Sequence, residues 1–352
     1  MAIFKRKAAG PADLAAPSSS RRSISLALQG GGAHGAFQWG VLDRLLEDDT
    51  LDIKAVSGVS AGAMNGAALV SGLTTGGSEG GRAALDKLWR EVNQSGGRNV
   101  FGDSAIWNAA SPPEWLKDNP FWRAGETLAM TMSPYEFNPL NHNPMNRVLK
   151  ASVDFEAVRG SDIRLFVAAT AVRQAKTRLF TSSEISADVL MASACLPHLF
   201  QAVEIDGEPY WDGGYAGNPT ITPLIRETAS CDTILVQVNP VERHDVPRSA
   251  REILNRVNEV SFNATLLKEL RMIAVLRQVV DAGSDEGKRW AQMRMHRIAS
   301  DMMTTLGYSS KLSAEWDFLV MLRDEGRRCA NAFLQQHGAD LGHRASLDLD
   351  AL

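Results

Sequence analysis

Residues 23–32 have the sequence Ser-Ile-Ser-Leu-Ala-Leu-Gln-Gly-Gly-Gly, an apolar run that ends in three glycines. Such a run predicts a short buried strand, which the glycines bring to an end. The arrangement is repeated where the apolar run Ile53–Val56 is followed by Gly58-Val-Ser-Ala-Gly62. Each glycine segment opens a predicted helix, over residues 34–47 after the first and 61–70 after the second.

Two later apolar runs, Ile163–Val172 and Thr233–Val238, predict further strands. Strands that alternate with helices are typical of an α/β fold with a mostly parallel central sheet and helices on both faces. The prediction is therefore a three-layer α/β protein. Sheets of this kind bind ligands beyond the carboxyl ends of their strands, and both glycine segments lie there.

The second glycine segment places a serine, Ser60, at a sharp turn between a strand and a helix. Its small neighbours, Gly58 and Gly62, permit the strained backbone that exposes a hydroxyl at the head of a helix. A serine attacks a carbonyl only when a base removes its proton, and the resulting oxyanion needs hydrogen-bond donors. The position between a predicted strand and a predicted helix favours a nucleophile over an ordinary Gly-Ser turn.

The first glycine segment supplies such donors, since Gly30, Gly31 and Gly32 present backbone N–H groups at a helix N-terminus. It also matches the dinucleotide-binding pattern Gly-x-Gly-x-x-Gly, which ends here at Gly35. That pattern requires an acidic residue near the end of the second strand. Asp52 has about the right spacing but precedes its strand, so a dinucleotide-binding oxidoreductase is the weaker interpretation.

These segments resemble the motifs of the patatin-like phospholipases. Leu28-Gln-Gly-Gly-Gly-Ala-His-Gly35 is similar to the oxyanion loop of that family, and Gly58-Val-Ser-Ala-Gly62 to its nucleophile motif. Trp211-Asp-Gly-Gly214 is similar to the motif of its catalytic aspartate, and Ser193-Ala-Cys-Leu-Pro197 to a segment shortly before it. The resemblance spans residues 23–240.

The resemblance implies a Ser–Asp dyad, in which Ser60 attacks an acyl carbonyl and Asp212 receives its proton. Gly213 and Gly214 flank this base and let the backbone pass close to the substrate. A carboxylate with an ordinary pKa of about 3.9 is a weak base for a serine. The dyad therefore depends on a dry, fixed geometry. The implied activity is carboxylic ester hydrolysis on lipids, with neither a metal nor a cofactor.

One position departs from the family, because His34 stands where members commonly have arginine. It suggests an alternative mechanism, in which the imidazole of a histidine activates Ser60 in place of Asp212. His142 and His198 are further candidates for such a base. A histidine in a loop is more often a solvated or supporting residue, so the Ser–Asp dyad is the favoured hypothesis.

Composition sets the broad class. A chain of 352 residues with 44% hydrophobic and 22% charged residues is ordinary for a soluble globular protein. Its net charge of -4 gives no argument for nucleic-acid binding. Three widely spaced cysteines fit a reducing compartment, and neither a signal-peptide core nor a membrane-spanning run is found. We therefore expect a cytoplasmic protein, peripheral membrane contact being left open.

The chain divides into three predicted parts. Residues 1–22 are an arm expected to be disordered, whose five basic residues against one acidic residue also suit an anionic membrane surface. Residues 23–245 are the patatin-like catalytic domain. Residues 246–352 are a helical region packed on that domain. Within the catalytic domain, residues 93–144 interleave tryptophans with glycine and proline, which predicts either an apolar cover over the site or an irregular insertion.

The C-terminal region carries two stripes of apolar residues at helical spacing, and most of them are expected to be packing faces. Membrane contact by one stripe is the alternative. The stripes consist of Ile253, Val257, Val260, Ala264 and Leu267, and of Leu312, Trp316 and Leu319.

A second class of function is a catalytically silent lipid-binding or scaffold protein on the same fold. Because Ser60, Asp212 and the glycine loop are all present, the sequence favours the enzyme. The expected partner is a lipid or another acyl ester; the sequence leaves the head-group and the oligomeric state open.

Overall fold

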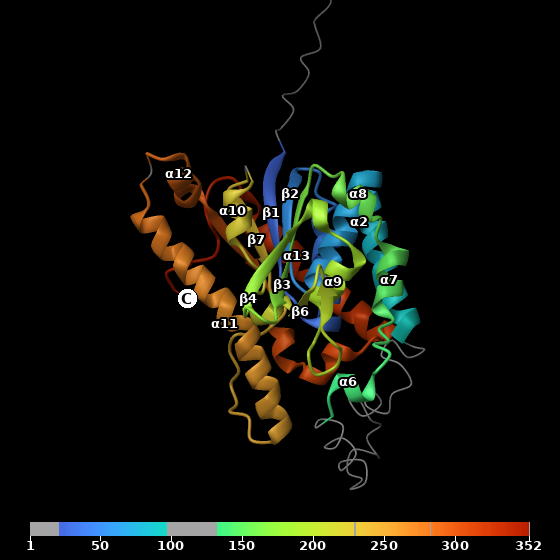
Figure 1. Cartoon of the computed structure of the whole chain (residues 1–352). Helices are drawn as coiled ribbons and strands as arrows, with labels where there is room; N and C mark the ends of the chain where they lie inside the picture. Colours follow the sequence, from blue (N-terminus) through green and yellow to red (C-terminus); the bar gives the residue numbers. More distant parts are fainter. Residues whose placement is uncertain (1–20, 97–131, 229, 282, 352) are drawn as a thin grey trace, which may run out of the picture.

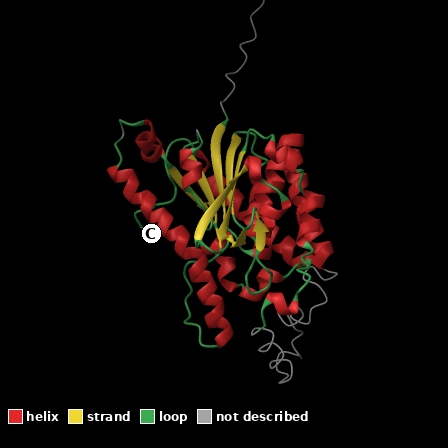
Figure 2. Cartoon of the chain, in the orientation of Figure 1, coloured by secondary structure: helices red, strands yellow, loops and turns green. Residues whose placement is uncertain are grey.

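The computed structural model describes residues 21–96, 132–228, 230–281 and 283–351. A single eight-stranded sheet runs through its centre, in the order β5-β6-β3-β2-β1-β7-β8, with β4 also paired to β3. Figure 2 shows the strands packed between helices. The strands are β1 (Arg22–Leu28), β2 (Leu51–Gly58), β3 (Arg164–Ala171), β4 (Lys176–Thr181), β5 (Val203–Ile205), β6 (Glu208–Asp212), β7 (Asp232–Val236) and β8 (Arg294–Ile298).

The sheet is mostly parallel, as the sequence predicts. β1 pairs in parallel with β2 and β7, β2 with β3, and β7 with β8. At one side the pairing becomes antiparallel, because β4 and β6 both run against β3 and β5 runs against β6. The four runs predicted as strands correspond to β1, β2, β3 and β7.

Helices cover both faces of the sheet, which confirms the three-layer prediction (Figure 1). Alternate residues of β1 show the two layers: Ile24, Leu26 and Leu28 belong to one hydrophobic core and Ala27 to the other. The helices are α1 (Gly35–Leu45), α2 (Ala61–Gly96), α6 (Pro134–Phe137), α7 (Met145–Ser152), α8 (Phe155–Arg159), α9 (Ala187–Ser193), α10 (Thr222–Arg226), α11 (Ala250–Val279), α12 (Asp285–Gln292) and α13 (Trp316–His337).

The two cores take different helices. The larger core collects apolar side chains of α1, α2, α7, α9 and α13, and the smaller one those of α10, α11 and α12. Of the C-terminal stripe that includes Leu312 and Trp316, Leu319 is fully buried, as expected for a packing residue.

The C-terminal region is more than a helical extension, because it also completes the sheet. β8 adds a parallel strand at the edge beside β7. The sequence did not predict this strand, since Arg294-Met-His-Arg-Ile298 is short and mostly polar. Its central histidine, His296, is nevertheless fully buried and lies 3.1 Å from a carboxylate oxygen of Asp232 on β7.

The stripe on α11 is placed differently from the prediction of a packing face. Ile253, Val257 and Val260 are 45%, 55% and 51% exposed. The buried side of α11 carries Phe262, which packs against Gly214 and Tyr215, and Leu266, which belongs to the smaller core. The packing interpretation is therefore wrong for the first half of this stripe, and its apolar side chains face outward.

Two sequence predictions lie outside the described residues. They concern the N-terminal arm, of which residues 1–20 are not described, and the tryptophan-rich part of residues 93–144, of which 97–131 are not described. Within the described ranges, no helix combines the length and the apolar character that a membrane span requires.

Candidate active site

Ser60 lies at the turn that joins β2 to α2. Its backbone has a φ of 55°, which is rare for a residue with a side chain and marks local strain. Gly62 makes the turn possible, since a Cβ there would lie 2.3 Å from the carbonyl oxygen of Leu28. Gly58 ends β2 just before the turn. The result is a strand–turn–helix corner that presents the Ser60 side chain at the head of a helix, as predicted.

Asp212 comes to the same place because β3 lies between β2 and β6 in the sheet. Gly58 on β2 pairs with Val167, and Asp212 on β6 pairs with Ala169, two residues further along β3. Gly213 lets β6 end against this strand, since a Cβ there would lie 2.1 Å from the carbonyl oxygen of Ala168. The glycine after Asp212 thus accommodates the β3 backbone rather than a substrate.

Ser193 connects the turn at Ser60 to strand β3. Its hydroxyl accepts a hydrogen bond from the backbone N–H of Ser60 at 2.9 Å and donates to the carbonyl oxygen of Ala168 at 2.7 Å. This serine is fully buried at the end of α9. The N–H of Ser60 is consequently occupied by the protein, and the turn that carries Ser60 is fixed to β3.

The Asp212 carboxyl group is buried, with 1% of the residue exposed, and Ser60 is 8% exposed. Burial raises the pKa of Asp212 to about 7, because a charged carboxylate is poorly solvated there. The N–H of Gly214, 2.7 Å from a carboxylate oxygen, the neighbouring Ser60 side chain and the charge of Lys311 oppose this rise in pKa. A carboxylate with a pKa near neutrality is a far better base than an ordinary aspartate.

The glycine loop after β1 borders the same cavity, though its three amides are not equivalent. The N–H of Gly30 donates to Oδ1 of Asn218 at 2.6 Å and is thereby occupied. Gly31 and Gly32 line the cavity beside Ser60, and no acceptor for their N–H groups is found among the described residues. Of the three amides predicted as oxyanion donors, those of Gly31 and Gly32 are therefore the two left available to a ligand in the cavity.

His34 is not placed as a base for Ser60. Its Nε2 lies 2.8 Å from the hydroxyl of Ser310, which itself donates to the carbonyl oxygen of Gly307. The imidazole therefore donates through Nε2. Burial first, and then the charges of Lys311 and Arg243, lower the pKa of His34 to about 3.

The other two candidate histidines also lie apart from the site. His142 and His198 are both exposed, and neither lines the cavity. None of the three histidines is thus placed to take a proton from Ser60.

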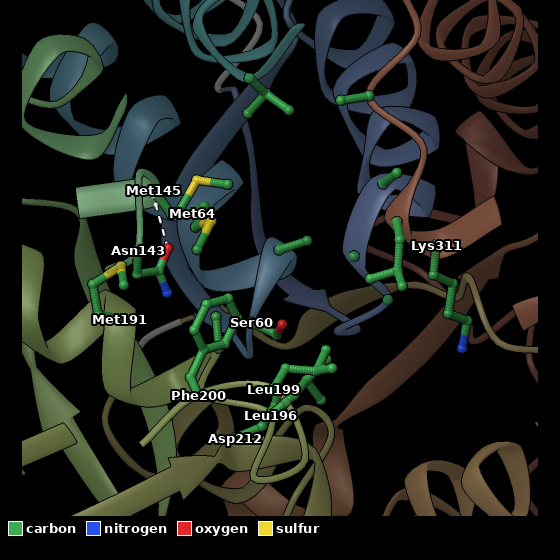
Figure 3. Close-up of a pocket in the computed structure, with 18 of the residues that line it drawn as sticks. Ser60, Met64, Asn143, Met145, Met191, Leu196, Leu199, Phe200, Asp212 and Lys311 are labelled. Carbon is green, nitrogen blue, oxygen red and sulfur yellow. Dashed lines mark hydrogen bonds between the residues drawn. The ribbon is translucent and has the colours of Figure 1, made fainter. Parts of the chain in front are cut away.

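The cavity has a volume of about 130 Å³ and is mostly apolar. Figure 3 shows Ser60 at its centre with Phe200, Leu196 and Leu199 close by, Met64, Met145 and Met191 on one side, and Lys311 on the other. Ser60, Asp212, Gly31 and Gly32 therefore all line one apolar cavity. An arrangement of this kind is suited to an acyl ester with an apolar chain.

The dinucleotide alternative finds no support in this geometry. Asp52 pairs with Ser23 at the amino ends of β1 and β2, and its carboxylate lies 2.6 Å from the ammonium of Lys54. The glycine loop follows the carboxyl end of β1. An acidic residue at the opposite end of the sheet cannot hold a ribose next to that loop.

Comparison with known proteins settles the family. The family model of the patatin-like phospholipases matches residues 26–225, more than half of the chain. The chain belongs to the patatin-like phospholipase family. Membership supports lipid acyl hydrolysis in general terms. Among curated proteins, no match is found.

Solved structures similar to this patatin-like chain include VipD from Legionella pneumophila, at 16% identity and a TM-score of 0.42, with 90% of this chain and 67% of VipD covered. The type III effector ExoU gives 15% identity, a TM-score of 0.33, and 90% and 53% coverage. The ExoU–SpcU complex of Pseudomonas aeruginosa gives 18%, 0.28, and 91% and 61%. The chain thus spans little more than half the length of these ExoU chains.

Some supporting residues of this patatin-like site escaped the sequence analysis. Asn218, Asn239 and Lys311 all contact the glycine loop or line the cavity, yet none belongs to a glycine or serine motif. Lys311 lies 251 residues after Ser60, in a segment predicted only as helical. Ser193 differs from these residues, because it lies in the segment Ser193–Pro197 that resembles the family. The resemblance does not indicate what Ser193 does.

Proposed function

We propose that this patatin-like chain is a serine lipid acyl hydrolase that uses a Ser60–Asp212 dyad. The observation that carries the proposal is the position of the Ser60 side chain beside the buried Asp212 carboxyl group, whose pKa it lowers, in the wall of one apolar cavity. Residues 23–245 would carry the dyad and the oxyanion loop, and residues 246–352 would complete the cavity wall through Phe262 and Lys311.

The reaction begins when Ser60 Oγ attacks the acyl carbonyl while Asp212 takes its proton. The N–H groups of Gly31 and Gly32 stabilise the negative charge that develops on the carbonyl oxygen. Asp212 then gives its proton to the departing alcohol, which leaves an acyl-serine. A water molecule, deprotonated by the same carboxylate, releases the fatty acid and restores Ser60.

The chemistry of the lining indicates the substrate class. Methionine, leucine and phenylalanine side chains surround the dyad, and they favour an aliphatic acyl chain over a polar acid. We therefore propose phospholipids, lysophospholipids or glycerides as substrates. The three free cysteines support action in a reducing compartment, which for this chain we take to be the cytoplasm.

The test is a panel of phospholipids, lysophospholipids and glycerides incubated with the wild-type chain and with Ser60→Ala, with products identified by mass spectrometry. We expect free fatty acid from at least one lipid class with the wild type and none above background with the variant. Equal product with both proteins across all classes would favour the catalytically silent lipid-binding protein.

The N-terminal half of α11 exposes apolar side chains, which are suited to contact with a lipid surface. Ile253, Leu254 and Val257 are about half exposed, whereas Asn258 and Phe262, further along the helix, line the cavity. In Figure 1 this half of α11 projects at the end of the molecule where the parallel strands end. We propose that these side chains insert into the membrane interface next to the cavity.

Replacing both Leu254 and Val257 with serine is expected to weaken binding to phosphatidylcholine vesicles by at least about tenfold, because two apolar side chains no longer enter the interface. Vesicle sedimentation measures this directly. Hydrolysis of vesicle lipid should fall in parallel, while hydrolysis of a monomeric short-chain nitrophenyl ester stays at the wild-type rate.

The matched control is the pair Val275→Ser and Val279→Ser, at the far end of the same helix, where both side chains are also exposed. We expect this pair to bind vesicles like the wild type. Equal loss with both pairs would show general destabilisation or non-specific adhesion and would contradict a docking surface beside the cavity.

A further inference from the structure

One segment of the C-terminal region that contacts the glycine loop is the 3₁₀ helix η5 (Tyr308–Leu312). It packs against η1 (Gly32–His34), which continues the glycine loop. The contact is direct, since a Cβ on Gly32 would lie 2.4 Å from the carbonyl oxygen of Lys311. The loop proposed to bind the oxyanion therefore rests on a segment more than 270 residues away in the sequence.

Lys311 makes a second, indirect connection to the loop. Its ammonium donates to Oδ1 of Asn239 at 2.5 Å. The Nδ2 of Asn239 in turn donates to the carbonyl oxygen of Gly30 at 2.7 Å. That carbonyl belongs to the same peptide group as the N–H of Gly31, which lines the cavity beside Ser60. A positive charge is thus linked by two hydrogen bonds to the far end of a candidate oxyanion donor.

The linking residue is held in one orientation. Asn239 is 1% exposed, and its backbone N–H donates to Oε1 of Gln29 at 2.8 Å. An ammonium can only donate, so the amide oxygen of Asn239 faces Lys311 and its nitrogen faces Gly30. The preceding peptide, between Gln29 and Gly30, is also held in place, because the N–H of Gly30 donates to Asn218.

We propose that Lys311 is a positioning residue of the oxyanion hole, which acts through Asn239 to orient and polarise the Gly30–Gly31 peptide toward the oxyanion. The inference rests on the proposed hydrolase function. Hydrogen bonds in a chain strengthen one another at low dielectric, so the N–H of Gly31 becomes a stronger donor when Lys311 is charged. The effect is largest when negative charge develops on the substrate, and it therefore acts on kcat more than on KM.

The charge state of Lys311 is set by its surroundings. Burial lowers the pKa of its ammonium to about 8; the carboxylates of Glu259 and Asp212 oppose this decrease in pKa, and Arg243 adds to it. His34, whose pKa the charge of Lys311 helps to lower, stays uncharged because that pKa is about 3. As the pH rises through about 8, Lys311 loses its proton. Activity should then fall on the alkaline side.

The experiment compares the wild type, Lys311→Met, Lys311→Arg and the control Lys176→Met, an exposed lysine on β4 outside the cavity lining. Steady-state hydrolysis of a short-chain nitrophenyl ester is measured between pH 6 and 10. Losing a whole oxyanion donor lowers kcat by about 10²–10³, so losing its polarisation should lower kcat by about tenfold. We expect this loss in Lys311→Met, with KM little changed and the alkaline limb gone.

Lys311→Arg should keep most of the activity, because an arginine stays charged, and its alkaline limb should disappear from this pH range. Lys176→Met should match the wild type. Wild-type kcat in Lys311→Met, or an alkaline limb at the same pH in the wild type and Lys311→Arg, would overturn the inference. The second comparison also decides the case if Lys311→Met does not fold. A wild type no more active than Ser60→Ala would refute the hydrolase function instead.

Discussion

Ser60→Ala is expected to lower ester hydrolysis by at least about 10⁴-fold, to the level left by binding and the oxyanion amides alone. The reason is that Ser60 and Asp212 line the cavity together, so the variant loses the hydroxyl that faces the proposed base. Initial rates on the best lipid found in the panel measure the loss.

The fold should tolerate this change. Removing one oxygen from a residue with a φ of 55° leaves the turn intact, since its backbone N–H still donates to Ser193. Thermal unfolding should therefore stay close to that of the wild type. Ser183→Ala, at an exposed serine of the 3₁₀ helix η2 (Ser182–Glu184) after β4, is the matched control and should retain full activity. Hydrolysis by Ser60→Ala at the wild-type rate would remove Ser60 as the nucleophile.

The sequence predicts the central part of this fold because its apolar runs are local and strong. The run Ile24–Leu28 is buried on both faces of the sheet, so it is almost continuously apolar, and the glycines behind it end the strand. By contrast, β8 escapes prediction because its burial depends on a long-range partner. His296 becomes a core residue only when Asp232 on β7 is present to accept its hydrogen bond.

The same contrast holds for the site. Ser60 and the glycines are required by backbone geometry within a few residues, so a short motif reveals them. Lys311 and Asn239 are linked to the glycine loop by hydrogen bonds between residues far apart in the sequence. No local sequence pattern indicates such partners. The exposed stripe on α11 was wrongly predicted as a packing face for a related reason. An apolar stripe at helical spacing predicts an amphipathic helix, but it does not indicate whether protein or lipid covers the apolar face.

Asp212→Asn is expected to lower kcat by about 10²–10⁴-fold, because an amide cannot take the proton of Ser60. Asparagine keeps the shape and can still accept the hydrogen bond that Gly214 donates at 2.7 Å. The pH profile gives an independent readout. In the wild type Asp212 must be ionised to act as a base, so activity rises as the pH increases through about 7. This acid limb should be missing from the residual activity of the variant.

The comparison with His34→Gln separates the two possible bases. Glutamine can still donate to Ser310, and His34 is uncharged at neutral pH, so this variant should retain most of the wild-type activity. Stability adds a further distinction. Because burial raises the pKa of Asp212 above its unfolded value, ionisation of this group opposes folding above about pH 4. Asp212→Asn should then unfold at a higher temperature than the wild type at pH 8 while losing activity. Full activity in Asp212→Asn together with loss in His34→Gln would assign the base to the imidazole.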